Sequence, residues 1–225
     1  MKWHEQAEAK WDSFARNWAS NSREMWETGS RKDIMPFLSK HVAKGSRVCD
    51  LGCGDGYGSM KLLSQGYRAV GLDLSNEMIE TAKSRLQGED VRFIQGDIAE
   101  LPFANGEFDA IMAINSIEWT ENPLEALHEM KRVVREGGLA CLGILGPTAG
   151  PRKAHSFHRL YGEKVIMNSM LPWEFERIAV ENGWKLIDEF WVEKKEAKRH
   201  IMPPMPKELQ QSVSFMWLFM LQKEA

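Results

Sequence analysis

The sequence predicts an α/β fold with a doubly wound sheet of seven strands, mostly parallel, with the last strand antiparallel and helices on both faces. Three observations support this prediction. Apolar runs of strand length alternate with helical segments, the first run ends in a glycine-rich turn, and a proline-containing loop precedes the last run. Strands that alternate with helices favour a parallel sheet, and a connection without a crossover helix favours an antiparallel partner.

The strands and helices are assigned from their hydrophobic period and their boundary residues. Seven apolar runs are expected to be strands: residues 48–50, 68–73, 91–98, 108–113, 139–145, 184–192 and 215–221. Helices are expected over residues 75–86 and 172–182, and between Asn122 and Gly137. Asn122 precedes Pro123, and an N-cap residue followed by proline is typical of a helix start.

The first 30 residues contain an amphipathic helical pattern rich in tryptophan. Trp11, Phe14, Ala15 and Trp18 fall at positions i, i+3, i+4 and i+7, which places them on one face of a helix. This face either packs on the rest of the protein or forms a cap over the active site. Residues 1–30 are interpreted as a helical cap, with Trp11 and Trp18 as candidate substrate contacts.

Composition and charge fit a single enzyme-sized domain over residues 1–225. The chain is 43% hydrophobic, which is enough for a substantial core. Its net charge of −3 and its isoelectric point near 6.1 argue against a nucleic-acid partner, because binding to phosphates requires a basic surface. A small-molecule partner is therefore expected, and the sequence leaves the oligomeric state open.

The cysteines and the N-terminus indicate a cytoplasmic protein without a membrane span. Cys49, Cys53 and Cys141 are odd in number and are interpreted as small packing residues in a reducing compartment. No second pair of Cys or His lies near Cys49 and Cys53, so no metal is expected. The first residues lack the apolar core of a signal peptide, and no apolar run reaches the roughly 18 residues of a membrane span.

The turn after the first strand indicates a nucleotide-type cofactor. Gly52, Gly54 and Gly56 follow Asp50 in the pattern G-x-G-x-G. Glycines at such a turn adopt positive φ and let a ligand approach the backbone. A dinucleotide fingerprint, G-x-G-x-x-G, requires a third glycine where this chain has Tyr57, which argues against a nicotinamide-dependent oxidoreductase.

Acidic residues follow the next two strands at equivalent places. Asp73 ends the segment 68–73, and Asp97 comes after the third apolar run. Since ligands of parallel sheets bind at the carboxyl ends of the strands, Asp50, Asp73 and Asp97 are expected to converge on one site. Asp73 also precedes a predicted helix, where a carboxylate is favoured by the helix dipole, and both roles are compatible in one residue.

These motifs resemble those of class I S-adenosylmethionine-dependent methyltransferases, specifically the small-molecule, type 11-like methyltransferase domain. The resemblance covers residues 45–145 and includes the glycine turn, Asp73, Asp97 and the segments 108–113 and 132–138. It implies a Rossmann-like sheet, S-adenosylmethionine as cofactor and S-adenosylhomocysteine as product.

The resemblance also implies roles for individual residues. Asp50, Gly52 and Gly54 are expected near the methionine part of the cofactor, with Cys53 in the same loop. Asp73 is expected at the ribose, and Leu74 and Ile98 at the adenine ring. Asp97 is expected to accept the exocyclic amine of adenine, and Asn115 to lie near the sulfonium. The predicted cofactor site thus consists of Asp50, Gly52, Cys53, Gly54, Asp73, Leu74, Asp97, Ile98 and Asn115.

Residues 146–171 follow the fifth predicted strand and are interpreted as a substrate lid, with residues 172–225 forming a C-terminal helix and strands. His155 and His158 are candidates for substrate contact or catalysis, and Arg159 for an anionic substrate group. Exposed loops also carry such residues without a function. Glu118 and Trp119, after the fourth strand, are a candidate base and a candidate substrate contact, although Trp119 also fits simple packing.

The expected activity is in-line methyl transfer to an unidentified small-molecule acceptor. Positioning alone can supply roughly 7 to 11 kcal/mol of barrier reduction, so a general base is optional. The alternative is a non-catalytic module that binds S-adenosylmethionine and senses it or regulates a partner. Asn115 is not followed by the Pro-Pro pair typical of enzymes that methylate bases in nucleic acid.

Overall fold

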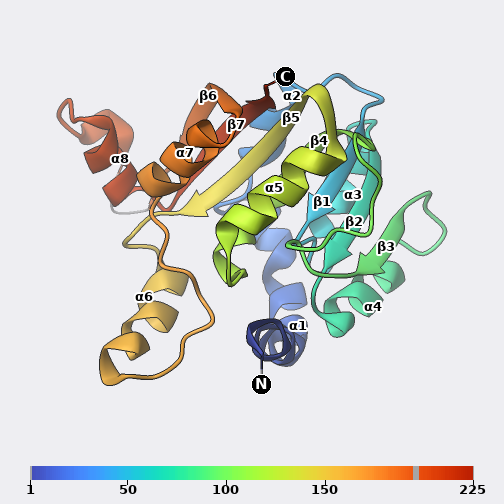
Figure 1. The fold of residues 1–225 in the computed structure, drawn as a ribbon, viewed down its shortest axis with the longest axis horizontal. Coiled ribbons are helices and arrows are strands. Elements are labelled where there is room, and N and C mark those ends of the chain that lie inside the picture. The colour runs from blue at the N-terminus through green and yellow to red at the C-terminus, as the bar shows by residue number, and fades with distance from the viewer. Residues whose placement is uncertain (1, 195–197, 225) are drawn as a thin grey trace.

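The computed structural model describes residues 2–194 and 198–224, apart from the side chains of 154–156 and 199. Within this part of the chain, seven strands form one sheet with the order β3-β2-β1-β4-β5-β7-β6 (Figure 1). The strands are β1 Arg47–Leu51, β2 Arg68–Asp73, β3 Arg92–Gln95, β4 Phe108–Ile114, β5 Val134–Leu145, β6 Trp184–Val192 and β7 Met216–Lys223.

The first five strands are parallel, and β7 lies antiparallel between β5 and β6. This confirms the predicted fold class, including the antiparallel last strand. The order of strands reverses between β1 and β4, so the carboxyl ends of these two strands flank the switch point at which ligands bind in such sheets.

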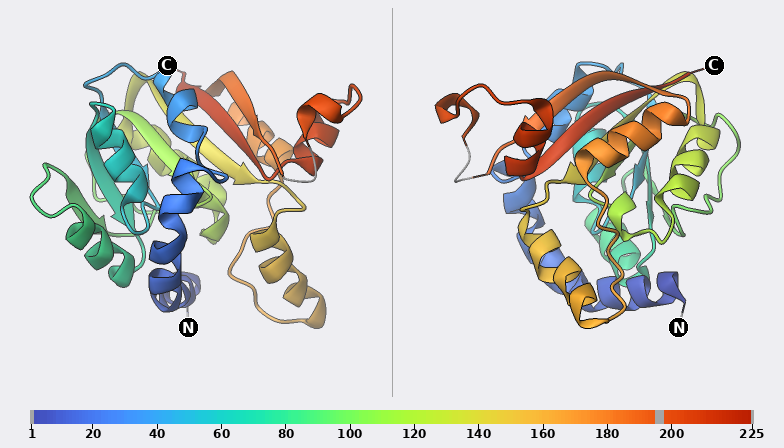
Figure 2. Two further views of the ribbon diagram at one scale, coloured as in Figure 1. Left: turned by 180° about the vertical axis from the view of Figure 1, so that it is seen from behind. Right: turned by 60° about the vertical axis from the view of Figure 1, so that its left-hand side comes forward.

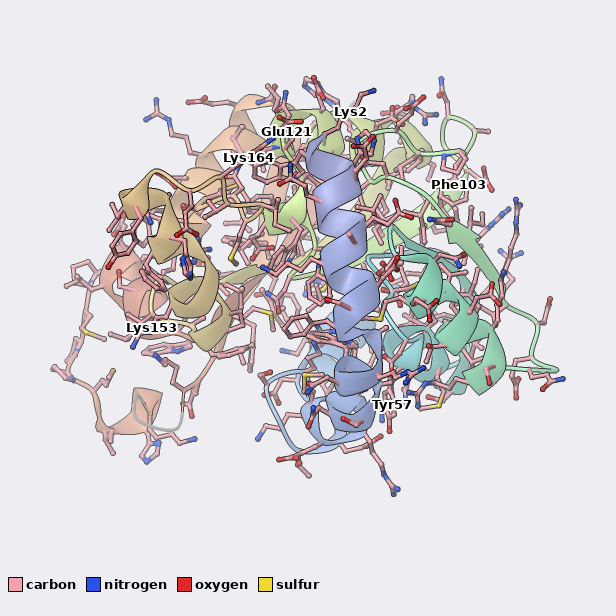
Figure 3. All side chains as sticks on the ribbon, turned by 90° about the horizontal axis from the view of Figure 1, so that it is seen from below. Lys2, Tyr57, Phe103, Glu121, Lys153 and Lys164 are labelled. Atoms are coloured by element: carbon pink, nitrogen blue, oxygen red, sulfur yellow. The ribbon has the colours of Figure 1, made fainter. Side chains whose placement is uncertain are left out.

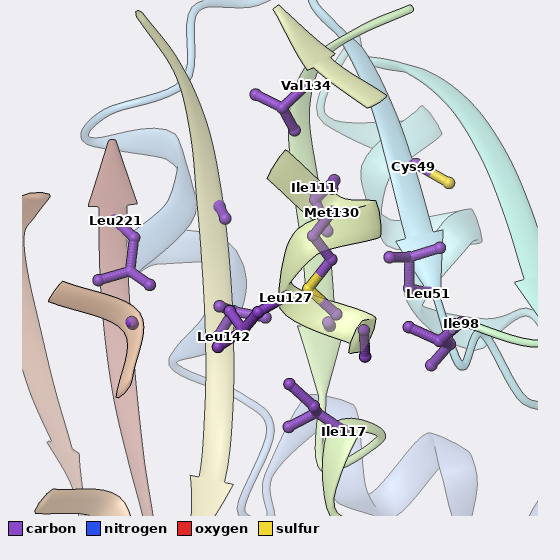
Figure 4. Close-up of a cluster of buried hydrophobic side chains, with 14 of the residues drawn as sticks. Cys49, Leu51, Ile98, Ile111, Ile117, Leu127, Met130, Val134, Leu142 and Leu221 are labelled. Atoms are coloured by element: carbon purple, nitrogen blue, oxygen red, sulfur yellow. The ribbon is translucent and has the colours of Figure 1, made fainter. Parts of the chain in front are cut away.

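Helices cover both faces of the sheet, as predicted. On one face, α5 (Pro123–Val133) and α7 (Pro172–Glu181) bury their apolar sides in the larger hydrophobic core, part of which is drawn in Figure 4. On the other face, α2 (Ile34–Ser39) and α3 (Tyr57–Ser64) pack in a second core with the end of α1 (Trp3–Glu27). Helix α4 (Asn76–Arg85) lies beside β3 and α1.

Helix α5 begins as predicted but ends early. The Asn122 side chain accepts a hydrogen bond from the Leu124 backbone N–H at 3.1 Å. The expected end at Gly137 is wrong, because Val134 already pairs with Phe108 as the first residue of β5. Gly137 has a φ of 66° and lies inside a strand that is five residues longer at its start than predicted. The third strand, β3, spans only Arg92–Gln95 and is therefore shorter than its predicted range of 91–98.

Helix α1 is long and crosses the edge of the sheet at which the parallel strands end (Figures 2 and 3). Its buried residues, Ala7, Ala15, Ser22 and Trp26, recur every four to eight positions along 25 residues. Phe14 is 45% exposed, so its predicted place on the buried face is wrong. The helix packs mainly on α4 and also on α3, and Trp3, Trp11 and Trp18 border the cavity at the glycine turn.

After β5 the chain leaves the sheet. It forms α6 (Gly150–Ser156) and the 3-10 helix η2 (Phe157–Tyr161), and then returns to α7. Shorter elements complete the structure: the 3-10 helices η1 (Ile117–Trp119) and η3 (Arg199–Ile201), and α8 (Lys207–Val213). In the described residues, no helix has the length and apolarity that a membrane crossing requires.

Candidate active site

The glycine turn after β1 has the backbone geometry that its sequence predicts. Gly52, Gly54 and Gly56 have φ values of 72°, 54° and 77°. The Gly52 N–H donates to the Leu72 carbonyl at 2.7 Å, and the Gly54 N–H donates to Asp73 Oδ2 at 2.8 Å. A methyl group on Gly52 would collide with the Ser116 side chain. The turn is therefore fixed against the ends of β2 and β4 and leaves no room for a side chain.

A cavity of about 320 Å³ lies between this turn, the ends of β2 and β4, η1 and helix α1. Its size lies at the lower end of the range for small-molecule sites. Residues predicted to bind the cofactor line much of it: Gly52, Gly54, Asp73, Leu74, Asp97, Ile98 and Asn115. The predicted substrate contacts Trp11, Trp18 and Trp119 line it as well.

Asp73 lies beside the start of α4 and also borders the cavity. Its Oδ1 accepts the Ser75 N–H at 2.9 Å, next to the start of α4, and its Oδ2 accepts the N–H of Gly54. Burial raises the pKa of Asp73 to about 6, although the two backbone hydrogen bonds act in the opposite direction. The same carboxylate borders the cavity, and its oxygens retain further lone pairs for hydroxyl donors.

Asn115 directly follows β4 and has a backbone conformation that few residues adopt. Its φ is 54°, and it is the one residue other than glycine with positive φ in the described chain. Its backbone N–H and its side-chain Nδ2 both donate to the Gly143 carbonyl, at 2.9 and 3.1 Å. Such left-handed residues cluster at functional sites, where the surrounding structure holds them in place. Asn115 borders the cavity directly beside Ser116.

Asp50 and Cys53 lie beneath the turn and do not line the cavity. The Asp50 carboxylate accepts a hydrogen bond from Ser59 Oγ at 2.7 Å, and burial raises its pKa to about 7. Burial also raises the pKa of the Cys53 thiol well above its usual value. Both side chains therefore support the turn from below, in contrast to the direct contact that the sequence predicted.

The wall opposite the turn is aromatic. The Trp11 ring packs edge-on against Trp18 and Trp119, with centroid distances of 5.5 and 4.8 Å. Trp3 joins this wall, since its indole N–H donates to the Trp119 carbonyl at 2.7 Å. Trp3 and its neighbour His4 both line the cavity. The predicted helical cap over residues 1–30 includes both residues, but nothing in the sequence indicated that His4 faces the site.

Arg31 was missed by the sequence analysis. It follows α1, is 9% exposed, and borders the cavity. Its guanidinium lies 4.9 Å from the Trp18 ring centroid and 5.5 Å from that of Trp26. No described residue forms a hydrogen bond or ion pair with this guanidinium, and burial lowers its pKa to about 10. No local pattern in the sequence distinguishes it from the exposed arginines nearby.

Glu118 is not placed to act as a base in this cavity. It is fully buried in η1, its Oε1 accepts the Leu145 N–H at 2.8 Å, and burial raises its pKa. Its backbone carbonyl accepts the Asn168 N–H at 2.6 Å. Glu118 therefore joins η1 to the end of β5 and to the returning chain, and does not line the cavity.

The predicted lid does not reach the cavity either, since no described residue of 146–171 lines it. His158 Nδ1 lies 3.1 Å from the Glu163 carboxylate on the outer surface, and Arg159 is exposed on η2. His155 belongs to α6, but its side chain lies outside the described residues. The cause is the path of the chain, which runs outward from β5 and leaves α1 as the element over the cavity (Figure 3).

Comparisons with known proteins agree with this site. Residues 49–142 match the family model described as a methyltransferase domain. The demethylmenaquinone methyltransferase of Renibacterium salmoninarum is 38% identical over 123 residues, which are 54% of this chain and 49% of the relative. The malonyl-acyl-carrier-protein O-methyltransferase of Paenibacillus sp. strain JDR-2 is 30% identical over 150 residues, 63% of this chain and 52% of the relative. The chain thus spans about half the length of these curated relatives.

The fold extends beyond the matched segment. A chain in the solved complex of the Haloferax volcanii Trm112 methyltransferase activator has a TM-score of 0.76 at 19% identity, with 97% of this chain and 98% of that chain covered. The segment with the glycine turn, Asp73, Asp97 and Asn115 therefore matches a methyltransferase domain in sequence, and the chain shares its fold with that neighbour. This match agrees with the resemblance to methyltransferases that the motifs indicated.

Proposed function

We propose that this protein transfers a methyl group from S-adenosylmethionine to a small-molecule acceptor. The observation that carries the proposal is the composition of the cavity. Residues of the methyltransferase domain form one wall, and tryptophans from α1 and η1 form the other. The net charge of −3 fits a small acceptor better than a nucleic acid, and the three free, buried cysteines fit the reducing cytoplasm.

The cavity provides groups that match each part of the cofactor. Asp73 offers carboxylate oxygens to the ribose hydroxyls, and Asp97 offers an acceptor to the adenine amine. Leu74 and Ile98 supply apolar surface for the ring. The glycine turn allows the methionine part to approach the backbone without a Cβ in between.

Arg31 completes this match at the methionine end. Arg31 is nine-tenths buried and has no anionic partner in contact among the described residues, so no ion pair there offsets the desolvation of its charge. The carboxylate of the methionine part is an anion that fits a bidentate guanidinium. Trp18 and Trp26 hold the Arg31 side chain on their faces, so that it borders the cavity near Gly52 and Gly54.

When bound, S-adenosylmethionine supplies a methyl group on a positively charged sulfur. The residues of this chain then have two tasks, which are to hold the acceptor in line with that methyl group and to exclude water. Trp11 and Trp119 form an apolar wall for the acceptor, and Asn115 borders the cavity at the switch point. Placement of this kind can supply roughly 7 to 11 kcal/mol of the barrier reduction. His4 lines the cavity and is the better candidate for a base than Glu118 or His158.

Calorimetric titration with S-adenosylmethionine, S-adenosylhomocysteine and NAD tests the cofactor assignment, and binding of both sulfur ligands but not of NAD is expected. Formation of S-adenosylhomocysteine in an acceptor screen then tests the transfer. Demethylmenaquinone and a malonyl-acyl carrier protein, taken from the names of the two relatives, are the first acceptors to try. The absence of cofactor binding would contradict the proposal. Binding without transfer to any acceptor would favour the sensor alternative.

A further inference from the structure

The segment 150–164, which we call the arm, carries an apolar surface that nothing in the described structure covers. It comprises α6, η2 and the following turn, and it projects from the body of the protein beneath β5 (Figures 1 and 2). Phe157, Leu160 and Tyr161 are 43%, 76% and 75% exposed. The Phe157 and Tyr161 rings lie 6.1 Å apart, so these side chains form one patch.

Positive charge surrounds this patch, although the whole chain is acidic. The arm contains four Lys or Arg residues and one acidic residue, Glu163, whereas the chain has a net charge of −3. Lys153, Arg159 and Lys164 are exposed. Lys153 precedes Phe157 by four positions on a continuous helix, and Lys164 follows Tyr161 by three. Lys153 therefore lies on the same side of the helix as Phe157, and Figure 3 shows the labelled Lys153 and Lys164 at different ends of the arm.

The base of the arm is firmly attached, which distinguishes the arm from a loose loop. The buried Arg152 donates from Nη2 to the carbonyls of Leu145 and Met170, at 2.9 and 2.8 Å. Glu118 holds the same junction through the N–H groups of Leu145 and Asn168. These hydrogen bonds hold the base of the arm in a fixed position relative to β5.

The junction also connects the arm to the cavity. Leu145, Ala149 and Met167 form a small apolar cluster at the base of the arm, and Trp119 packs against it. Trp119 is at the same time part of the aromatic wall of the cavity. The base of the arm is therefore packed against one residue of the aromatic wall of the cavity.

We propose that the arm binds an anionic phospholipid surface. Phe157, Leu160 and Tyr161 enter the interface between headgroups and acyl chains, and Lys153, Arg159 and Lys164 contact lipid phosphates. Exposed aromatic and aliphatic side chains with flanking cations have the amphipathic character of interfacial segments, whereas an acidic protein partner would need the cations but not the projecting apolar patch. This inference is independent of the proposed methyl transfer, because it uses none of the cavity residues.

Sedimentation with phospholipid vesicles tests the inference on the full chain. Each cation near an anionic surface contributes about fivefold to binding, so three cations favour phosphatidylglycerol-containing vesicles over phosphatidylcholine vesicles by on the order of 100-fold at low salt. Raised salt should weaken this preference. The triple variant Phe157→Ser, Leu160→Ser, Tyr161→Ser is expected to lose at least tenfold in binding to the anionic vesicles.

The double variant Ile201→Ser, Leu209→Ser is the matched control, because it removes two exposed apolar side chains, 69% and 53% exposed, outside the arm. It should bind the vesicles like the unmodified protein. Circular dichroism and S-adenosylhomocysteine titration check that both variants are folded. Equal vesicle binding by the triple variant, or no vesicle binding by the unmodified protein, overturns the inference. Capture by poly-glutamate beads without vesicle binding also overturns it and indicates an acidic protein partner. A failure of cofactor binding alone affects only the proposed methyl transfer.

Discussion

Replacement of Arg31 by methionine is expected to weaken S-adenosylhomocysteine binding by about 30-fold or more. The guanidinium is 9% exposed and borders the cavity, and its pKa of about 10 leaves it charged at neutral pH. Removal of one partner of a buried, hydrogen-bonded charge pair costs about 2 to 5 kcal/mol, and the lower value corresponds to about 30-fold. Methionine retains an unbranched apolar chain against Trp18 and Trp26, so the packing changes little.

Calorimetric titration measures this loss directly, and thermal unfolding provides a second measurement. At a ligand concentration of about 100 times the dissociation constant, the unmodified protein gains roughly 2.7 kcal/mol of stability. At the same concentration, a 30-fold weaker variant gains about 0.9 kcal/mol. For a chain of this size the ligand-induced rise of the midpoint should fall from about 5 to 11 °C to about 2 to 4 °C.

Two further variants separate the proposed ion pair from general effects of mutation. Arg31→Lys retains the charge but loses the bidentate geometry, so its affinity should lie between those of the unmodified protein and Arg31→Met. Arg23→Met changes an exposed arginine on α1, the helix that precedes Arg31, and should bind normally. An unchanged dissociation constant in Arg31→Met would refute the assignment of Arg31 to the carboxylate.

Three other predictions concern the turn and its neighbours. Gly52→Ala should destabilise the protein by about 1 to 3 kcal/mol more than Gly45→Ala in denaturant titrations. Both glycines have positive φ, but only at Gly52 would a Cβ collide with a side chain, that of Ser116. Equal losses of stability would mean that backbone strain alone accounts for the effect. Burial raises the pKa of Asp50 to about 7 from an ordinary 3.8, so the folded state holds an extra proton between these values, and the unfolding free energy should decline as pH rises through this window. Asp50→Asn should remove that part of the decline, and parallel pH profiles of the two proteins would contradict the argument. Asp97→Asn should weaken S-adenosylhomocysteine binding about tenfold in calorimetry. The amide oxygen of the asparagine keeps the hydrogen bond from the Ala99 N–H, so its NH₂ group points toward the adenine amine and two donors face each other. Undiminished affinity would exclude this contact.

The parts of the structure that the sequence predicted are those fixed by local physics. Strand β6 and the start of α5 follow from apolar runs and from residues such as Asn122 that act through their immediate neighbours. The predicted end of α5 was wrong because Val134 pairs with Phe108 of β4 and so begins strand β5. Because these two residues are 26 positions apart, the local sequence near Gly137 does not indicate their pairing.

The sequence also predicted the cofactor side of the candidate site, but it did not predict the acceptor side. Gly52, Asp73 and Asp97 lie at strand ends, and parallel topology alone brings strand ends together. Arg31 and His4 reach the cavity only because α1 crosses the sheet edge, and that crossing depends on its contacts with α3 and α4. The sequence of an amphipathic helix shows which face is buried but not what it is buried against.

The path of α1 changes where acceptor specificity should be sought. The sequence pointed to the segment after β5, but none of its described residues lines the cavity, and its buried Arg152 bonds to the end of β5. The cavity wall opposite the turn comes instead largely from Trp3, Trp11 and Trp18, on a helix that precedes the segment matched by the methyltransferase family model. A change of acceptor can therefore proceed through α1 while the turn and the strand ends, which the cofactor requires, stay the same. Substitutions on the cavity-facing side of α1 should for this reason alter acceptor affinity more than cofactor affinity, with Arg31, just beyond the helix, as the exception.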